Sequence, residues 1–227
     1  MENLAQILIY IHAFFGGIGL ISGIAAITLK KGSKPHKRSG KIFSYAMIIS
    51  SLTSLMIARM PGHENLFLFL IGVFTIYLVL AGNRVLTLKN KAKSSADMID
   101  KSISGVMLLA SVLMLIIGIV QLIRHTGGNE ILFLFFGAFG LYMTLKDFHT
   151  FRVFKEQKNA WLRSHLGRMI AALIASITAF MVAGLHIQTL IAWMLPSVIG
   201  TIYIGYWNSR MKECVPSPVP QKTAEAK

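Results

Sequence analysis

The sequence predicts an all-α integral membrane protein, a bundle of seven transmembrane helices. Hydrophobic residues make up 54 % of the 227 residues, and charged residues only 14 %, against roughly a quarter in soluble domains. The mean hydropathy is +0.62. Seven apolar segments each reach the roughly 20 residues that a membrane-spanning helix needs. This composition excludes a disordered chain, a soluble enzyme and a disulfide scaffold, since the lone Cys214 has no intramolecular partner.

The seven segments make up one transmembrane domain, which covers residues 1–211. They are residues 4–29, 42–60, 66–88, 102–123, 131–150, 166–187 and 189–211. The first is too long for a cleaved signal peptide, and no basic region precedes it. Residues 212–227 contain three prolines and few large apolar residues, which predicts a disordered tail.

Positive charge gathers on one side of the predicted helices. Of the 23 Lys and Arg residues, 21 lie in the stretches 30–41, 84–101, 146–168 and 210–227, which gives that side a net charge of +15 and the other side −1. Because Lys and Arg are retained in the cytoplasm, we expect the N-terminus outside and the C-terminus inside a bacterial cytoplasmic membrane. The net charge of +14 therefore indicates orientation and attraction to anionic lipid headgroups, with no nucleic-acid partner. The oligomeric state stays open.

An internal repeat divides six of the helices into hairpins. Residues 66–80 and 132–145 align with one deletion, which pairs Gly72, Phe74 and Tyr77 with Gly137, Phe139 and Tyr142. The pair Ser39–Gly40 matches Ser104–Gly105, and Gly40 also matches Gly167. The pattern predicts one helix followed by three repeated hairpins, although apolar helices also resemble one another by composition alone.

Small and hydroxylated residues predict close helix packing. Gly19 and Gly23 form a GxxxG motif in the first helix, and such small residues let helices approach closely in lipid. The polar run Ser50, Ser51, Thr53 and Ser54 in the second helix is expected to hydrogen-bond main-chain carbonyls or neighbouring helices.

The sequence places no Asp, Glu, Lys or Arg near the middle of a predicted helix, which is where ion-coupled transporters usually carry such groups. The last helix has no Lys for a retinal Schiff base, and common catalytic motifs are missing. The histidines are the remaining candidates for chemistry.

His12 lies inside the first predicted helix, roughly 12 Å from its outer end at 1.5 Å per residue. An ionisable residue inside the membrane is a functional hypothesis by default, and His12 is a candidate ligand of haem or a metal. No other helix has a histidine at the same depth, which disfavours a bis-histidine haem there. The alternative is a neutral imidazole hydrogen-bonded to a neighbouring helix.

A second group of candidates gathers at the inner side. His36 lies in the basic loop, Asp147 and His149 close the fifth helix, and His165 lies where the sixth begins. Imidazoles and carboxylates are suitable ligands for a divalent metal, so His36, Asp147, His149 and His165 are candidate metal ligands.

The alternative is an ion-pair network at the same place. In that interpretation Asp147 pairs with Arg38, Arg84 or Arg168, and His165 contributes, with Trp161, to the start of the sixth helix. The loop 30–41 is expected to be a tight turn because it contains Gly32, Pro35 and Gly40.

The chain resembles a family of bacterial multi-pass membrane proteins known as domain of unknown function 2306. The resemblance is carried by IHAFFGGIGLISG at 11–23 and KKGSKPHKRSGKIFSYAM at 30–47, with WLRSHLGRMIAALIASITAF at 161–180 and WMLPSVIGTIYIGYW at 193–207. It has Lys37 where the family pattern has Arg. The resemblance implies a multi-pass membrane fold and draws attention to His12, His36, Arg38, Gly40, Asp147, Trp161 and His165. It implies no activity.

Three functions therefore stay open. The first is a redox protein that binds a metal or haem through histidines at helix ends. The second is a transporter of a small or lipid-like solute, for which a continuous polar cavity that reaches the midplane would be required. The third is a membrane assembly or sensing protein without catalytic chemistry.

Overall fold

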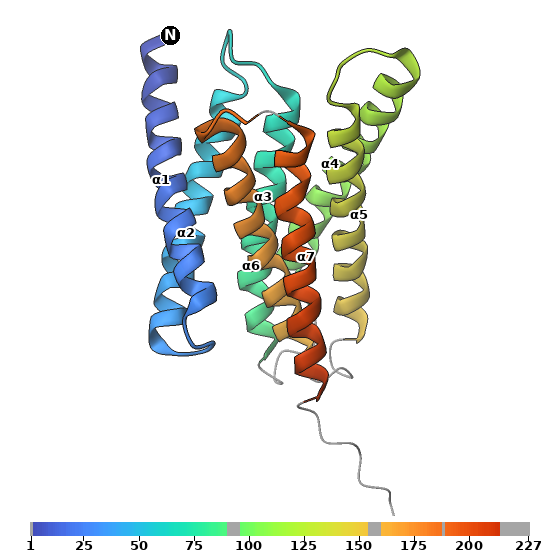
Figure 1. Ribbon diagram of the computed structural model, residues 1–227. Coiled ribbons are helices and arrows are strands. Elements are labelled where there is room, and N and C mark those ends of the chain that lie inside the picture. The colour runs from blue at the N-terminus through green and yellow to red at the C-terminus, as the bar shows by residue number, and fades with distance from the viewer. Residues whose placement is uncertain (1, 90–95, 154–159, 188, 214–227) are drawn as a thin grey trace, which may run out of the picture.

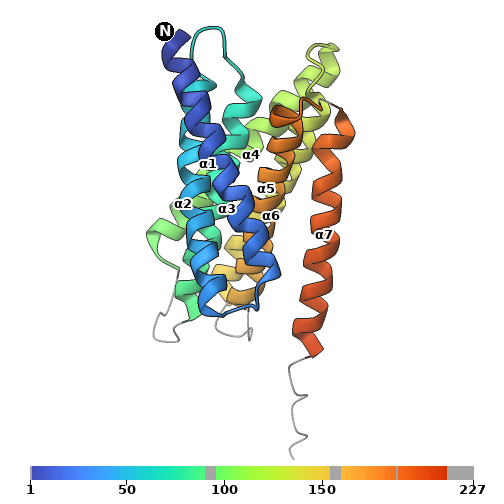
Figure 2. The ribbon, with the colours of Figure 1, turned by 60° about the vertical axis from the view of Figure 1, so that its left-hand side comes forward.

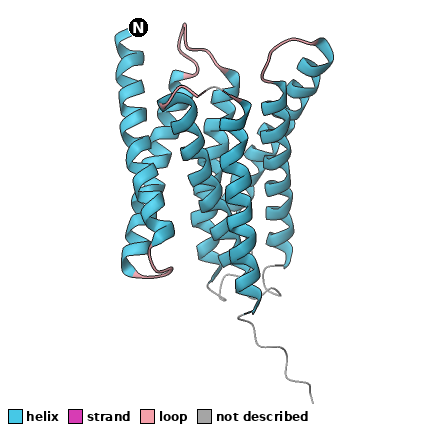
Figure 3. Cartoon of the chain, viewed as in Figure 1, coloured by secondary structure: helices cyan, strands magenta, loops and turns pink. Residues whose placement is uncertain are grey.

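The computed structural model describes residues 2–89, 96–153, 160–187 and 189–213, and the regular structure of these residues is helical throughout (Figures 1 and 3). The helices are α1 Glu2–Thr28, α2 Lys34–Ile57, α3 Leu66–Arg84, α4 Met98–Arg124, α5 Glu130–Val153, α6 Ala160–Ala179 and α7 Leu190–Glu213. A 3₁₀ helix, Val85–Lys89, extends α3, and a π-helix, Phe180–Gly184, extends α6. The predicted tail from residue 214 onward lies outside the described residues.

The prediction of seven spanning helices is confirmed at the level of length and composition. Seven helical stretches are each long and apolar enough to cross a membrane. The side of the membrane on which each end lies stays a prediction, so we call the end with the α1–α2 turn and the α7 C-terminus the basic end of the bundle.

Two helix pairs flank a central pair. The α1–α2 and α4–α5 hairpins lie on opposite sides of α3 and α6 (Figure 1). α3 packs on α2, α4 and α6, whereas α7 packs mainly on α6 and stands apart at one side of the bundle (Figure 2). α3 therefore lies in contact with most of the neighbouring helices.

The basic segment 30–41 is mostly helix, so the expectation of a tight turn across it is wrong. α2 begins at Lys34, and Pro35 lies in its first turn, where a missing N–H costs nothing. Ser33 caps the helix, because its Oγ accepts a hydrogen bond from the His36 N–H. Hydropathy finds the apolar part of α2 and misses the two basic turns before it.

The short turn between α1 and α2 is held by Lys31. Its Nζ donates hydrogen bonds to the carbonyl oxygens of Ala26 and Ile27 at the end of α1, which lack partners within the helix. The ammonium also lies 5.8 Å from the ring centroid of Trp207 on α7. Burial in this turn lowers the pKa of Lys31. The contact places the start of α2 near the end of α7.

α5 and α6 also extend beyond their apolar segments. α5 continues to Val153 and α6 begins at Ala160, rather than at the expected residues 150 and 166. As a result Asp147 and Arg168 lie well inside their helices, six residues before the end of α5 and eight after the start of α6. Both charges thus lie further from their helix ends than the sequence predicts.

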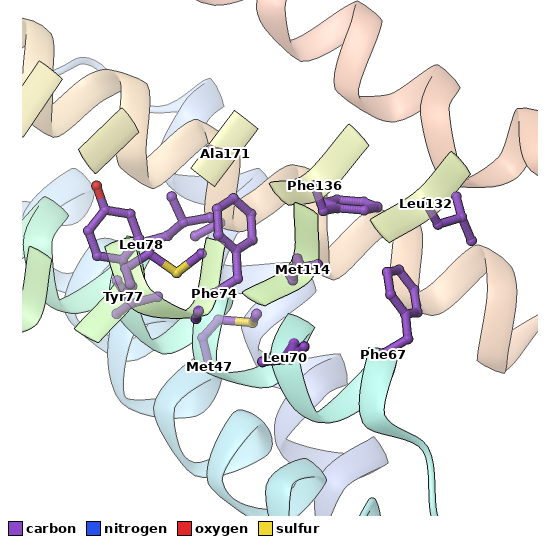
Figure 4. Close-up of a cluster of buried hydrophobic side chains, with 14 of the residues drawn as sticks. Met47, Phe67, Leu70, Phe74, Tyr77, Leu78, Met114, Leu132, Phe136 and Ala171 are labelled. Atoms are coloured by element: carbon purple, nitrogen blue, oxygen red, sulfur yellow. The ribbon is translucent and has the colours of Figure 1, made fainter. Parts of the chain in front are cut away.

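Apolar and aromatic side chains fill the middle of the bundle (Figure 4). The buried cluster includes Phe67, Leu70, Phe74, Leu78, Met107, Met114, Phe133 and Phe136. Four helices, α3 to α6, supply most of it. This layer closes the centre of the molecule.

The GxxxG motif of α1 packs as predicted. A Cβ on Gly19 would lie 2.8 Å from Met47 Sδ, and one on Gly23 would lie 2.7 Å from Leu173 Cδ1 and 2.9 Å from Phe43 Cδ2. The absence of a side chain at these two positions therefore lets α1 touch α2 and α6 closely.

Candidate polar site within the helix bundle

Asp147 is the most deeply buried charged residue described. It belongs to α5, its exposure is 0 %, and it lies about 9 Å from the helix end at 1.5 Å per residue. A carboxylate taken out of water loses several kcal/mol of solvation unless charges and hydrogen bonds replace it. Its partners therefore decide what this position can do.

Arg168 on α6 supplies the compensating charge. Its Nη2 contacts Asp147 Oδ1, and its exposure is 5 %. The pair joins α5 to α6, two helices that otherwise touch little. This confirms the ion-pair alternative for Asp147, with Arg168 as the partner among the three arginines considered.

Two hydroxyl groups complete the shell of the carboxylate. Tyr77 Oη on α3 donates a hydrogen bond of 2.6 Å to Asp147 Oδ2, and Ser104 Oγ on α4 donates one of 2.9 Å to the same oxygen. Ser104 is 1 % exposed. One carboxylate thus links α3, α4, α5 and α6, and we call Tyr77, Ser104, Asp147 and Arg168 the polar cluster.

A second ion pair lies nearer the basic end. Arg84 Nε lies 2.5 Å from Asp100 Oδ1, and Arg84 Nη2 lies 3.3 Å from Asp97 Oδ2. Asp97 and Asp100 also form a capping box at the start of α4, which satisfies N–H groups that the helix leaves unpaired. Arg84 therefore ties the end of α3 to the start of α4.

A cavity of about 20 Å³ lies between the two ion pairs. Asp100, Ser104, Asp147, Ser164 and Arg168 are among the residues that line it. Arg168 Nε is buried and has no hydrogen-bond partner. A space of this size holds about one water molecule, and the lining groups would bind such a water through both donors and acceptors.

The polar cluster ends where the apolar core begins. About one helical turn further from the basic end lie Phe74, next to Tyr77 on α3, and Met107, next to Ser104 on α4. Both belong to the buried apolar cluster. A second cavity of about 30 Å³ lies against this layer and is lined mainly by apolar residues of α3, α5, α6 and α7. Neither cavity is lined as a polar path through the middle of the bundle.

His12 bonds to the neighbouring helix, as its alternative interpretation predicts. Its Nδ1 donates to the main-chain oxygen of Ser50 at 2.8 Å, and Ser50 Oγ donates to the main-chain oxygen of His12 at 3.0 Å. The prediction for the α2 hydroxyl run is confirmed for Ser50 and for Thr53, whose Oγ1 donates to main-chain oxygens of its own helix. A cofactor role for His12 stays a prediction.

The four predicted metal ligands do not form one group. Asp147 is buried while His149, two residues later on the same helix, is exposed, since residues two apart on a helix face different directions. His36 Nδ1 donates to the Ala26 oxygen at 2.9 Å, and His165 Nδ1 donates to the Gly82 oxygen at 2.7 Å. Within the described residues, no group of three or more His, Cys, Asp or Glu side chains is placed to hold a metal ion.

The other predicted residues have separate positions. Arg38 is exposed on α2, and Trp161 is partly buried in the first turn of α6. His165 lies in the second turn of α6 and bonds to α3, so it connects two helices rather than starting one. Arg84 forms an ion pair, but with Asp97 and Asp100.

Tyr77 and Ser104 were not among the predicted site residues, although both stand out in the internal repeat. Tyr77 aligns with Tyr142 and Ser104 with Ser39. Tyr142 is 58 % exposed, whereas Tyr77 turns inward to Asp147. The repeat marked the positions, but only the packing of α3 against α4 and α5 shows which copy is used.

No family model, curated protein or solved structure matches this chain. The resemblance to domain of unknown function 2306 therefore stays a prediction. The described residues thus form seven helices long and apolar enough to span a membrane, with a charged site buried between four of them.

Proposed function

We propose that the protein is a membrane sensing protein in which the polar cluster is the element that changes state. The observation that carries this proposal is the position of Asp147, which joins four helices through one fully buried carboxylate. Any event that neutralises Asp147 or draws Arg168 away changes the packing of all four helices together.

A contribution to the stability of the fold does not explain well why a buried ion pair is present here. Replacing a buried ion pair with apolar residues of similar volume is often neutral or stabilising. Ionisable residues inside membrane proteins are expensive and mark functional positions. A charged group that is costly to bury and linked to several helices is suited to act as a switch.

The arrangement favours sensing over transport. The cavity beside the cluster is lined by both polar and apolar side chains, and the buried apolar cluster fills the middle of the bundle next to it. A polar site bounded by an apolar core is suited to receive a proton or a small polar ligand rather than to pass it across the bundle.

Protonation is the simplest event that tests the switch. The charged and titratable groups that face Asp147 or share its cavity are Arg168, Tyr77 and Asp100, with Arg84 paired to Asp100. Of these, protonation of Asp147 alone removes the negative charge that holds Arg168. The proposal therefore predicts that acidification separates the α4–α5 hairpin from α6.

The experiment measures the distance between spin labels at the exposed positions 145 on α5 and 206 on α7 in lipid nanodiscs, after Cys214→Ser. The wild-type distance distribution should shift between about pH 7.5 and about pH 3, the lower value lying below the ordinary carboxyl range. Asp147→Asn should give the shifted distribution at both pH values, and Asp147→Glu should keep the response.

Glu64→Gln is the matched control, because Glu64 is an exposed carboxylate at the other end of the bundle and its loss should change nothing. The proposal is wrong if the wild-type distribution is the same at both pH values. It is equally wrong if Asp147→Asn responds as the wild type does.

A second candidate is binding of a metal or haem through His36 and His165. Each donates Nδ1–H to a main-chain carbonyl, and this bond orients the ring and leaves Nε2 as the free ligand atom, as in many metal sites. Metal analysis and the visible absorption spectrum of the purified protein test it. One equivalent of metal or haem, lost in His36→Ala and His165→Ala, would favour this candidate.

A further inference from the structure

Four cations lie along one exposed face at the start of α2. Lys34, Lys37, Arg38 and Lys41 are spaced three and four residues apart, which places them side by side on a helix. All four are exposed. We call Lys34, Lys37, Arg38 and Lys41 the basic stripe.

Among the residues that the structure describes, no acidic side chain pairs with the stripe. Residues 3–63 contain no Asp or Glu, and the ion pairs in the described part of the chain use Arg84 and Arg168 instead. Four unneutralised cations on two helical turns create a strong local positive potential. This potential favours a ligand with at least one negative charge.

The same helix face becomes apolar as it enters the bundle's membrane-spanning part. Lys34, Arg38 and Lys41 are followed at helical spacing by Tyr45, Leu52 and Met56, which are 62 %, 49 % and 57 % exposed. The Lys41 ammonium lies 5.8 Å from the ring centroid of Tyr45, at the boundary between the charged and the apolar parts. An aromatic ring at this position is typical of a membrane–water interface.

We propose that this face of α2 binds an anionic phospholipid of the leaflet at the basic end. The phosphate-bearing headgroup lies on the basic stripe, and the acyl chains run along Tyr45, Leu52 and Met56. The order of the chemistry along the helix, cationic, then aromatic, then aliphatic, matches the order along a phospholipid. Clusters of four or more Lys and Arg next to a spanning helix commonly bind anionic lipids.

A second copy of this chain fits the face less well, because symmetric pairing would bring two sets of four cations together. The inference does not depend on the proposed sensing function. It concerns α2, whereas the polar cluster involves α3 to α6.

The experiment compares retention of phosphatidylglycerol and phosphatidylcholine by native mass spectrometry of the purified full-length protein. We expect the wild type to retain phosphatidylglycerol selectively, and the variant Lys34→Gln/Lys37→Gln/Arg38→Gln/Lys41→Gln to bind it at least about tenfold more weakly. Because all four positions are exposed, the variant should fold normally.

A matched control removes the same charge elsewhere at the basic end. Lys101, Lys146, Arg152 and Arg210 are exposed on α4, α5 and α7, and their replacement by Gln should leave lipid retention unchanged. Equal loss in both variants would overturn the proposal, because it would show a general charge effect. A variant with arginine at all four stripe positions should retain the lipid.

Inorganic phosphate distinguishes the headgroup from the whole lipid. If phosphate alone displaces phosphatidylglycerol at concentrations comparable with those of the lipid, the apolar half of the site is wrong. We expect vesicles of phosphatidylglycerol to displace the bound lipid and phosphate not to displace it. The variant Tyr45→Ser/Leu52→Ser should weaken lipid retention although its basic stripe is intact.

Discussion

Asp147 shows how a single residue acquires its role from its surroundings. The carboxylate is fully buried and interacts with Arg168, Tyr77 and Ser104. Each partner replaces part of the solvation that the charge has lost. Removing any one of these partners leaves the buried carboxylate with fewer hydrogen bonds or less compensating charge. The free energy of unfolding should fall because the group left behind is charged.

Replacement of Tyr77 by Phe removes one donor and little volume. A hydrogen bond to a charged group contributes about 1.5–3 kcal/mol, so Tyr77→Phe should lower the free energy of unfolding by about that amount. Denaturation by sodium dodecyl sulfate in mixed micelles measures the change. Tyr142→Phe is the control, because Tyr142 is the exposed counterpart in the repeat, and equal effects at both positions would contradict the assigned bond.

The histidines illustrate what sequence reasoning finds and what it misses at this scale. Residue type and approximate depth drew attention to His12, and residue type with a position near the start of the sixth helix drew attention to His165. Their partners are main-chain oxygens of Ser50 and Gly82, and a main-chain oxygen has no signature in the sequence. The sequence therefore could not show that these two histidines link helices.

At the scale of the element, hydropathy predicts the number of helices but not their ends. The basic turns of α2 are helical although they are not apolar, and so are the residues Arg163, Ser164 and His165 near the start of α6. Helix ends depend on caps such as Ser33 and on partners such as Arg168, which a hydropathy window averages away. This is why Asp147 and Arg168 were expected near helix ends and lie instead about 9 and 12 Å inside.

Close packing of α1 can be tested at a single glycine. Gly23→Ala places a methyl group within 2.9 Å of side chains on both α2 and α6, and such overpacking typically costs about 1–3 kcal/mol. Thermal unfolding in detergent should show this loss. Gly17→Ala is the control, because nothing lies within 4 Å of a Cβ there, and a loss as large at Gly17 would contradict the packing account.

At the scale of the whole molecule, α3 and α6 form the centre and the hairpins α1–α2 and α4–α5 flank them (Figure 1). The seven spans could be predicted from the sequence because the hydropathy of each span depends only on its own residues. It could not predict which helices meet, because apolar surfaces carry little information about their partners in lipid. The internal repeat and the orientation stay predictions, and the charge asymmetry remains the evidence for the latter.

The polar cluster matters at this scale because it connects helices that are distant in the sequence. Tyr77 and Asp147 are 70 residues apart, and α5 and α6 have little other contact. Coupling between Asp147 and Arg168 is therefore the central claim. Its strength decides whether the cluster can act on four helices together.

A double-mutant cycle tests this coupling most directly. Asp147→Asn and Arg168→Gln should each cost about 3–5 kcal/mol in the free energy of unfolding, since each leaves an uncompensated buried group. The double variant should cost less than the sum by at least about 2 kcal/mol, because neither charge is then left alone. Costs that add to within about 0.5 kcal/mol would show that the two residues do not interact and would contradict the account.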